Sequence, residues 1–179
     1  FRRVDIISLQ RTIAKGTVEA GLVKTKARLR AALREAIATF KSRMLAWVEA
    51  NSVRGRAPVG KIPIATGYLK ESATDVIGQS FAKGFAFAAY FGFAAEHAKY
   101  VDEGRPLGKM PPVDEIEAWC ISVGIPTEAA WAIAVNIYNE GIEAKKFFNP
   151  GVDYAKIVLR EELERAFTKY EVIAIVRLT

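Results

Sequence analysis

Hydrophobic residues recur every three or four positions between Val23 and Ala50, which is the spacing of one face of an α-helix. The members of this stripe are Leu29, Leu33, Ile37, Phe40, Met44 and Trp47. No Gly or Pro lies between residues 22 and 54 to interrupt the pattern. A helix of these 28 residues would be about 42 Å long, well above the average for globular proteins. We therefore predict a long N-terminal helix, preceded at residues 6–20 by a segment that is at best weakly helical.

A strict alternation of side chains over residues 85–93 predicts a β-strand. One face carries Phe85, Phe87, Ala89, Phe91 and Phe93, and smaller or less apolar residues occupy the other. A face this aromatic is more typical of a hydrophobic core than of a binding site. Together with a candidate strand over residues 74–81 and a turn at residues 82–84, it predicts a β-hairpin. A last, buried strand is predicted at residues 172–176, pairing with this hairpin or with a neighbouring subunit.

Three more helices are predicted in the second half of the chain. The first begins with Asp114 and Glu115, as the helix dipole favours, and ends at Gly124. We expect Thr127 to cap the second, which runs to about residue 140 and is apolar on more than one side, so that it should be largely buried. Asn149 is predicted to cap the third, which presents one apolar face as far as residue 170.

The order of these elements predicts an α+β fold, because the helices are segregated from the strands. We expect a long N-terminal helix, an antiparallel β-sheet made of the hairpin and the C-terminal strand, and three further helices packed on it. The chain would divide into an N-terminal helical arm at residues 1–50 and an α+β core domain at residues 51–179. Apolar residues make up 51% of the chain, enough for a sizeable core.

Basic residues concentrate in the first third of the chain. Residues 1–60 hold 13 Lys and Arg against 4 Asp and Glu, whereas the remainder is mildly acidic. This polarity suggests a surface that faces a polyanion or an acidic partner, and a solvated helix face is the alternative interpretation. Two Gly- and Pro-containing loops add further cations, and plain solvated loop charge is again the alternative. These are the candidate contacts with a partner or with DNA in a channel: Arg54, Arg56, Lys61, Arg105 and Lys109.

The sequence offers no motif for catalysis. His97 is the one histidine, and the chain has no Gly-x-Ser-x-Gly motif for a serine hydrolase. Cys120 lies on an apolar helix stripe without an activating base. Residues 104–110 resemble a phosphate-binding loop only superficially, because three residues separate the glycines and Met110 stands where a hydroxyl is needed. One Cys and one His cannot form a structural zinc site. We expect no catalytic residue, no cofactor and no metal, in a protein that is not an enzyme.

Short motifs follow the long charged helix in a fixed order. Residues 66–72 are Thr-Gly-Tyr-Leu-Lys-Glu-Ser, residues 100–104 are Tyr-Val-Asp-Glu-Gly, and residues 108–112 are Gly-Lys-Met-Pro-Pro. A helix with Ile116 and Trp119, an apolar segment over residues 131–142, and Phe-Phe-Asn-Pro at residues 147–150 complete the series. In their order and spacing, over roughly residues 25–170, these segments resemble the neck or tail-completion proteins of tailed bacteriophages, minor structural components of the head–tail junction.

The resemblance implies a virion structural protein without enzymatic activity. It implies a ring, commonly sixfold, that joins or completes the tail around the channel through which DNA passes. The implied partners are further copies of the chain, the neighbouring head-connector and tail-tube or tail-terminator proteins, and, non-specifically, DNA in the channel. The protein would be made in the host cytoplasm and reside in the virion neck or tail. We expect no membrane contact, since no apolar run approaches the roughly 20 residues needed to span a bilayer.

Two other hypotheses remain open at this point. An electrostatic module for duplex DNA would use the basic N-terminal third, and its affinity would fall steeply with salt. A hydrolase would use His97, and its activity would be lost in His97→Ala.

Overall fold

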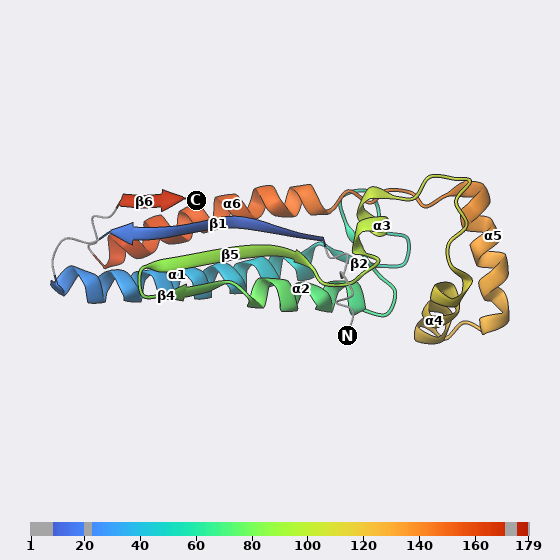
Figure 1. Cartoon of the computed structure of the whole chain (residues 1–179), viewed down its shortest axis with the longest axis horizontal. Coiled ribbons are helices and arrows are strands. Elements are labelled where there is room, and N and C mark those ends of the chain that lie inside the picture. The colour runs from blue at the N-terminus through green and yellow to red at the C-terminus, as the bar shows by residue number, and fades with distance from the viewer. Residues whose placement is uncertain (1–8, 20–22, 171–174, 179) are drawn as a thin grey trace, which may run out of the picture.

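The computed structural model describes residues 9–19, 23–170 and 175–178, and its two longest helices lie side by side (Figure 1). The predicted long helix is α1 (Val23–Ala50), and α6 (Phe148–Lys169) runs antiparallel to it. The apolar stripe of α1 is buried along most of its length against α6 and the sheet. The long N-terminal helix is therefore confirmed, and it is the longest element of the core.

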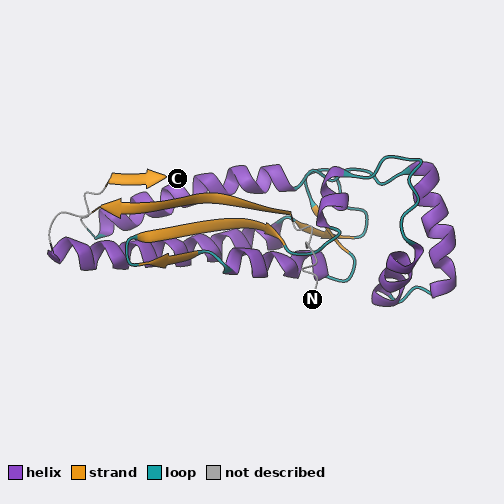
Figure 2. Cartoon of the chain, viewed as in Figure 1, coloured by secondary structure: helices purple, strands orange, loops and turns teal. Residues whose placement is uncertain are grey.

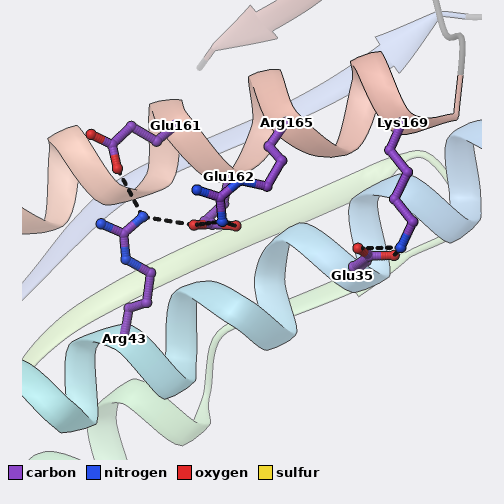
Figure 3. A network of polar contacts seen from close by, with 6 residues as sticks. All are labelled: Glu35, Arg43, Glu161, Glu162, Arg165 and Lys169. Atoms are coloured by element: carbon purple, nitrogen blue, oxygen red, sulfur yellow. Dashed lines mark hydrogen bonds and ion pairs between the residues drawn. The ribbon is translucent and has the colours of Figure 1, made fainter.

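A network of ion pairs joins the polar edges of these two helices (Figure 3). Arg43 on α1 donates to Glu162 at 2.6 Å and to Glu161 at 2.8 Å, both on α6. The side chain of Glu162 is only 3% exposed and also accepts from Arg165 at 3.0 Å. Hydrogen bonds from Arg43, to Glu162 first and then to Glu161, raise the pKa of the arginine above its usual value. Because the carboxylate of Glu162 has almost no access to water, its pairing with Arg43 helps to fix how α6 lies on α1, while Arg165 supports it from within α6.

The sheet has the strand order β4-β5-β1-β6, with antiparallel neighbours throughout. Its strands are β1 (Leu9–Glu19), β4 (Phe81–Lys83), β5 (Ala86–Phe93) and β6 (Ile175–Leu178). Figure 2 shows them running along the same direction as the two long helices. The expectation of a weakly helical segment at residues 6–20 is thus wrong over residues 9–19. Pairing with β5, which is distant in the chain, makes this segment a strand, and local propensity does not reveal such pairing.

The C-terminal strand pairs with β1, from Gly16 opposite Leu178 to Glu19 opposite Ile175. The predicted strand covered residues 172–176, of which residues 172–174 lie outside the described part. Among the described residues, β6 pairs with β1 and not with the β4–β5 hairpin. The predicted hairpin partner was wrong because β1 had not been recognised as a strand, and β1 lies between the two.

The predicted strand over residues 74–81 is wrong for most of its length, because α2 (Tyr68–Gly78) occupies it. Its Leu69, Ala73, Val76 and Ile77 follow helical spacing and are buried. The β-branched residues in this stretch favour a strand in isolation, but packing against β5 decides for the helix. The hairpin is confirmed with a shorter first strand, β4.

The aromatic face of β5 forms the centre of the core, as predicted. Phe91 meets the edge of Trp47 on α1 at 5.7 Å between ring centroids and stacks on Phe148 of α6 at 5.8 Å. Phe93 contacts the ring of Phe147 edge to face at 5.2 Å. Because α1, α6 and β5 share this one core, the boundary predicted at residue 50 has no counterpart in the packing of the described residues. Between α1 and α2, the chain forms the short parallel strands β2 (Ser52–Arg54) and β3 (Ile62–Ile64), which are joined by a loop.

A second group of helices lies beyond the end of the sheet (Figure 1). It consists of α4 (Val113–Val123), the 3₁₀ turn η1 (Thr127–Ala129) and α5 (Ala130–Glu140), which pack mainly on one another. The predicted bounds of α4 are confirmed, with Gly124 left-handed at φ 74°. Thr127 does not cap α5 through its side chain, since it opens the 3₁₀ turn instead. The prediction that α5 is largely buried is wrong, because α4 alone cannot cover its several apolar faces.

The helix α6 begins one residue before the cap that the sequence predicted. The buried carboxylate of Asp102, in the short helix α3 (Ala98–Glu103), accepts the backbone N–H of Phe148 at 2.8 Å. This bond from a distant residue replaces the capping role expected of Asn149. With these corrections, the predicted α+β class is confirmed: a long N-terminal helix, an antiparallel sheet and further helices.

Candidate functional site

The two basic loops named by the sequence analysis lie against the same segment of chain, residues 142–145. In the first loop, the N–H of Gly60 donates to the carbonyl of Lys145 at 2.5 Å. In the second, the N–H of Arg105 donates to the carbonyl of Ile142 at 3.0 Å. The structure thus brings the two loops together between the end of α3 and the start of α6.

The five predicted side chains in these loops differ in what they do. Arg54, Arg56 and Lys109 are exposed and available to a partner. Lys61 instead donates to the side-chain oxygen of Asn51 at 2.7 Å. Arg105 donates to the carbonyl of Met110 at 3.1 Å and lies 5.5 Å from the centre of the Tyr100 ring. Contact with a partner or with DNA remains a prediction for all five residues, and Lys61 and Arg105 already hold the loops in shape.

Two crossing segments, residues 104–108 and 141–145, connect the main body to the outlying helices, and we call them the stalk. Arg105 and Ile142 exchange backbone hydrogen bonds of 3.0 and 2.9 Å across it. Gly104 and Gly141 flank this pair at φ 77° and 74°. A Cβ on either would lie 2.6 or 2.5 Å from a carbonyl oxygen of the opposite segment. Only glycine fits at both positions, which explains why the chain can cross so closely here.

The helices α4 and α5, with η1 between them, form a helical hairpin at the end of the stalk. Its outer surface exposes large apolar side chains: Ile121 is 70% exposed and Trp131 64%. Glu117 and Ile121 are four residues apart and share one face of α4, while Glu128 and Trp131 share one face of the chain entering α5. Ile121, Glu128 and Trp131 flank the turn between the helices, and Glu117 lies one helical turn earlier on α4. We call these four residues the tip of the hairpin.

An open groove of about 1030 Å³ separates the helical hairpin from the main body. Its walls come from α2, α3, the stalk and both outlying helices, and its lining is predominantly apolar. Representative lining residues are Tyr68, Tyr100, Ile116, Trp119 and Ile137. This groove could not be predicted from the sequence, because the segments that form its walls are far apart in the chain. The one signal for it in the sequence is the set of prolines and glycines in and around the stalk segments.

His97 lies at the edge of this groove with its ring 5.9 Å from that of Tyr68. Partial burial lowers the pKa of His97 below its usual value, and the neighbouring Glu96 opposes this shift. Neither hydrogen bond nor ion pair joins its imidazole to a nucleophile among the described residues. The hydrolase hypothesis gains no support from this arrangement, since a general base needs a reacting group within hydrogen-bond reach.

Other candidate chemistry is accounted for by structure. Cys120 is fully buried between the outlying helices, as its apolar stripe predicted. Asp102 is occupied by the start of α6, so it is not a free carboxylate for acid–base work. No group of three or more potential metal ligands occurs within the described residues. Likewise, no described helix is both long and apolar enough to cross a membrane.

Charge is unevenly divided between the two ends of the molecule. Residues 113–140 contain five acidic residues and no Lys or Arg. None of these five carboxylates forms an ion pair within the described part of the chain. On α1, by contrast, Glu35 is the one carboxylate between Lys26 and Val48, and it is held by Lys169 at 2.7 Å and by Tyr170 at 2.8 Å. The exposed side of α1 is therefore basic, and the helical hairpin is acidic.

No protein-family model, no curated protein and no solved structure matches this chain. Its function is therefore inferred from its residues and from the geometry described above.

Proposed function

We propose that this chain is a structural protein of the neck or tail of a tailed bacteriophage. It would form a ring, of six copies by the family resemblance, that joins or completes the tail at the head–tail junction around the DNA channel. Its neighbours would be head-connector and tail-tube or tail-terminator proteins. The protein would act by binding alone, with no bond made or broken.

The observation that carries this proposal is the exposed helical hairpin. Apolar side chains exposed together on the surface of a soluble protein mark a site of contact with a partner. Here Trp131 and Ile121 flank one turn, and no other described element of the chain covers them. A projecting element with uncovered aromatic surface is typical of a subunit that is buried in an assembly.

The motifs that resemble the phage family also occupy architectural positions. Residues 66–72 start α2, and residues 100–104 form the end of α3 and the first glycine of the stalk. Residues 108–112 lead from the stalk into α4. These motifs therefore support the body, the stalk and the projecting helices, which fits a role in assembly better than one in catalysis.

The proposal is tested on particles of the phage whose genome encodes the chain. Mass spectrometry of purified particles should detect the protein, and immunogold labelling should place it at the head–tail junction. An amber mutant should accumulate heads and tails that fail to form complete particles. Absence of the protein from purified infectious particles would refute the proposal.

A second candidate function is electrostatic binding of duplex DNA, and it is favoured by the exposed cations of α1. Arg30 and Arg34 lie on its exposed side, and neither has a carboxylate partner among the described residues. Such binding should weaken with salt, with a log–log slope of about −0.9 for each phosphate contacted. A flat response between about 50 and 200 mM salt, a range over which phosphate-mediated binding changes by orders of magnitude, would exclude it.

A further inference from the structure

The acidic tip of the helical hairpin has a complementary surface elsewhere on the same molecule. That surface lies on the exposed side of α1 and on β4, and we call it the basic face. Its cations are Arg30, Arg34, Lys41 and Lys83. Between Lys26 and Val48 of α1 and in β4, Glu35 is the one carboxylate among the described residues, and its side chain is held by Lys169 and Tyr170.

The basic face also contains a hollow lined by both polar and apolar side chains. Arg34, Lys41 and Phe81 border a shallow depression of about 320 Å³ between α1 and β4. Phe81 is 47% exposed beside it. Arg30, one helical turn before Arg34 on α1, lies 4.9 Å from the centre of the Phe85 ring, which holds its guanidinium in place. A hollow with an aromatic wall and a cationic rim suits an aromatic side chain flanked by carboxylates, which is what the tip presents in Trp131 and Glu128.

One molecule cannot bring these two surfaces together. The helical hairpin lies beyond one end of the sheet, whereas β4 lies alongside α1 in the main body, well away from α4 and α5 (Figure 1). The main body, built on the α1–α6 pair, separates them. Among the described residues, the tip has carboxylates that lack a cationic partner, and the basic face has cations that lack a carboxylate partner. These groups can therefore pair only between two molecules.

We propose that the tip of one copy docks on the basic face of the next copy. Trp131 would enter the hollow beside Phe81, with Glu117 and Glu128 facing Arg34 and Lys83. Because the two surfaces are different, the contact is heterologous and each copy uses both, so the copies add head to tail and close into a ring where the rotation permits. The inference deepens the proposed function, on which it rests for its biological setting, by naming the surfaces through which copies meet.

The test is self-association of the full chain by sedimentation velocity, over about 1 μM to 1 mM. Glu128→Lys and Arg34→Glu should each raise the dissociation constant at least about tenfold, because each turns an attraction into a repulsion. Matched controls are Glu164→Lys and Arg160→Glu, which reverse exposed charges of α6 outside both surfaces and should change the constant less than about threefold. Circular dichroism should show that all four variants are folded.

Mixing the two surface variants gives the sharpest result. In an equimolar mixture, the lysine introduced at position 128 of one protein meets the glutamate introduced at position 34 of the other. The unaltered tip and the unaltered face meet at the alternate contact. Association should return to within about threefold of the unaltered protein, because every contact is again an attraction.

The apolar part of the contact has its own pair of variants. Trp131→Ser should weaken association at least about tenfold, because it removes the side chain that fills the hollow. The control is Ile157→Ser, which alters a similarly exposed apolar residue on α6 and should have little effect.

Four outcomes overturn the inference. The first three are a chain that stays monomeric at the highest concentration, surface variants that associate like the controls, and a mixture that is not rescued. The fourth is an Arg34→Glu variant that no longer binds duplex DNA but self-associates as the unaltered chain does, which would assign the basic face to nucleic acid. These results are independent of the particle experiment. If mixing restores association but the protein is absent from phage particles, only the proposed function is refuted. If the protein is present in particles but mixing does not restore association, only the docking is refuted.

Discussion

Replacing Gly151 by alanine should destabilise the protein, although alanine is the better helix former. Gly151 lies in the first turn of α6, where the gain in helix propensity is at most about 1 kcal/mol. A Cβ at this position would lie 2.4 Å from two carbons of the Phe91 ring and 3.0 Å from a carbon of Trp47. Favourable carbon contacts lie at about 3.5–4.0 Å, so the neighbouring rings would have to move.

The Phe91 ring has little room to retreat. It is fully buried, stacks on Phe148 at 5.8 Å, and is edge to face with Phe93 at 5.8 Å. Overpacking of a close-packed core costs about 1–3 kcal/mol. Since the ring is held on several sides, we take the upper half of that range, and the gain in propensity offsets part of it. The expected net loss is about 1–2 kcal/mol of unfolding free energy.

Urea unfolding followed by circular dichroism measures this loss directly. The matched control is Gly78→Ala at the end of α2, where a Cβ meets no atom within 4 Å. That variant should be as stable as the unaltered chain or more stable, by up to about 1 kcal/mol. If Gly151→Ala were as stable as Gly78→Ala, the close approach of α6 to β5 through Gly151 would be refuted, and with it our account of the core.

Three further outcomes are expected. Glu162→Ala should cost about 2–3 kcal/mol in urea unfolding, because it removes an almost fully buried carboxylate together with its charge-assisted hydrogen bonds to Arg43 and Arg165, whereas Glu161→Ala, which alters a half-exposed side chain, should cost under about 1 kcal/mol; equal costs would contradict the network. Gly141→Ala should lower the melting temperature and increase amide exchange in α4 and α5 relative to α6, because its Cβ would meet the opposite stalk carbonyl; a uniform change would contradict a local effect. Hydrogen bonds from Lys169 and Tyr170 lower the pKa of Glu35 below 4.5, so this carboxylate contributes stability above its unfolded pKa that is lost as pH falls through its folded pKa; Glu35→Gln should flatten the unfolding free energy between about pH 5 and 3, and an unchanged slope would refute the linkage.

The local sequence pattern was sufficient to predict the helices and strands whose apolar residues recur at a regular spacing. The stripe of α1 and the alternating phenylalanines of β5 each place one continuous apolar face against the core, so their type follows from the spacing alone. The acidic start and the glycine end likewise set the bounds of α4. The same reasoning placed the basic loops and found no catalytic motif.

Elements that depend on distant partners were not predictable in this way. β1 contains Lys15 and Gly16 and has no clear alternation, and it is a strand because β5 and β6 pair with it on both sides. α2 contains several β-branched residues but is a helix because β5 offers it an apolar surface. The first N–H of α6 is bonded to Asp102, 46 positions away, which no local capping rule could show.

The sequence by itself determined the fold class, the long basic helix, the aromatic core strand and the acidic character of residues 113–140, because each is a property of neighbouring residues. Only the tertiary structure decided that these acidic helices project on a stalk, that Trp131 stays uncovered, and that Arg34 and Phe81 share one hollow. Such features arise where segments far apart in the chain meet, and the free energy of that meeting is set by surfaces that no short window of sequence contains.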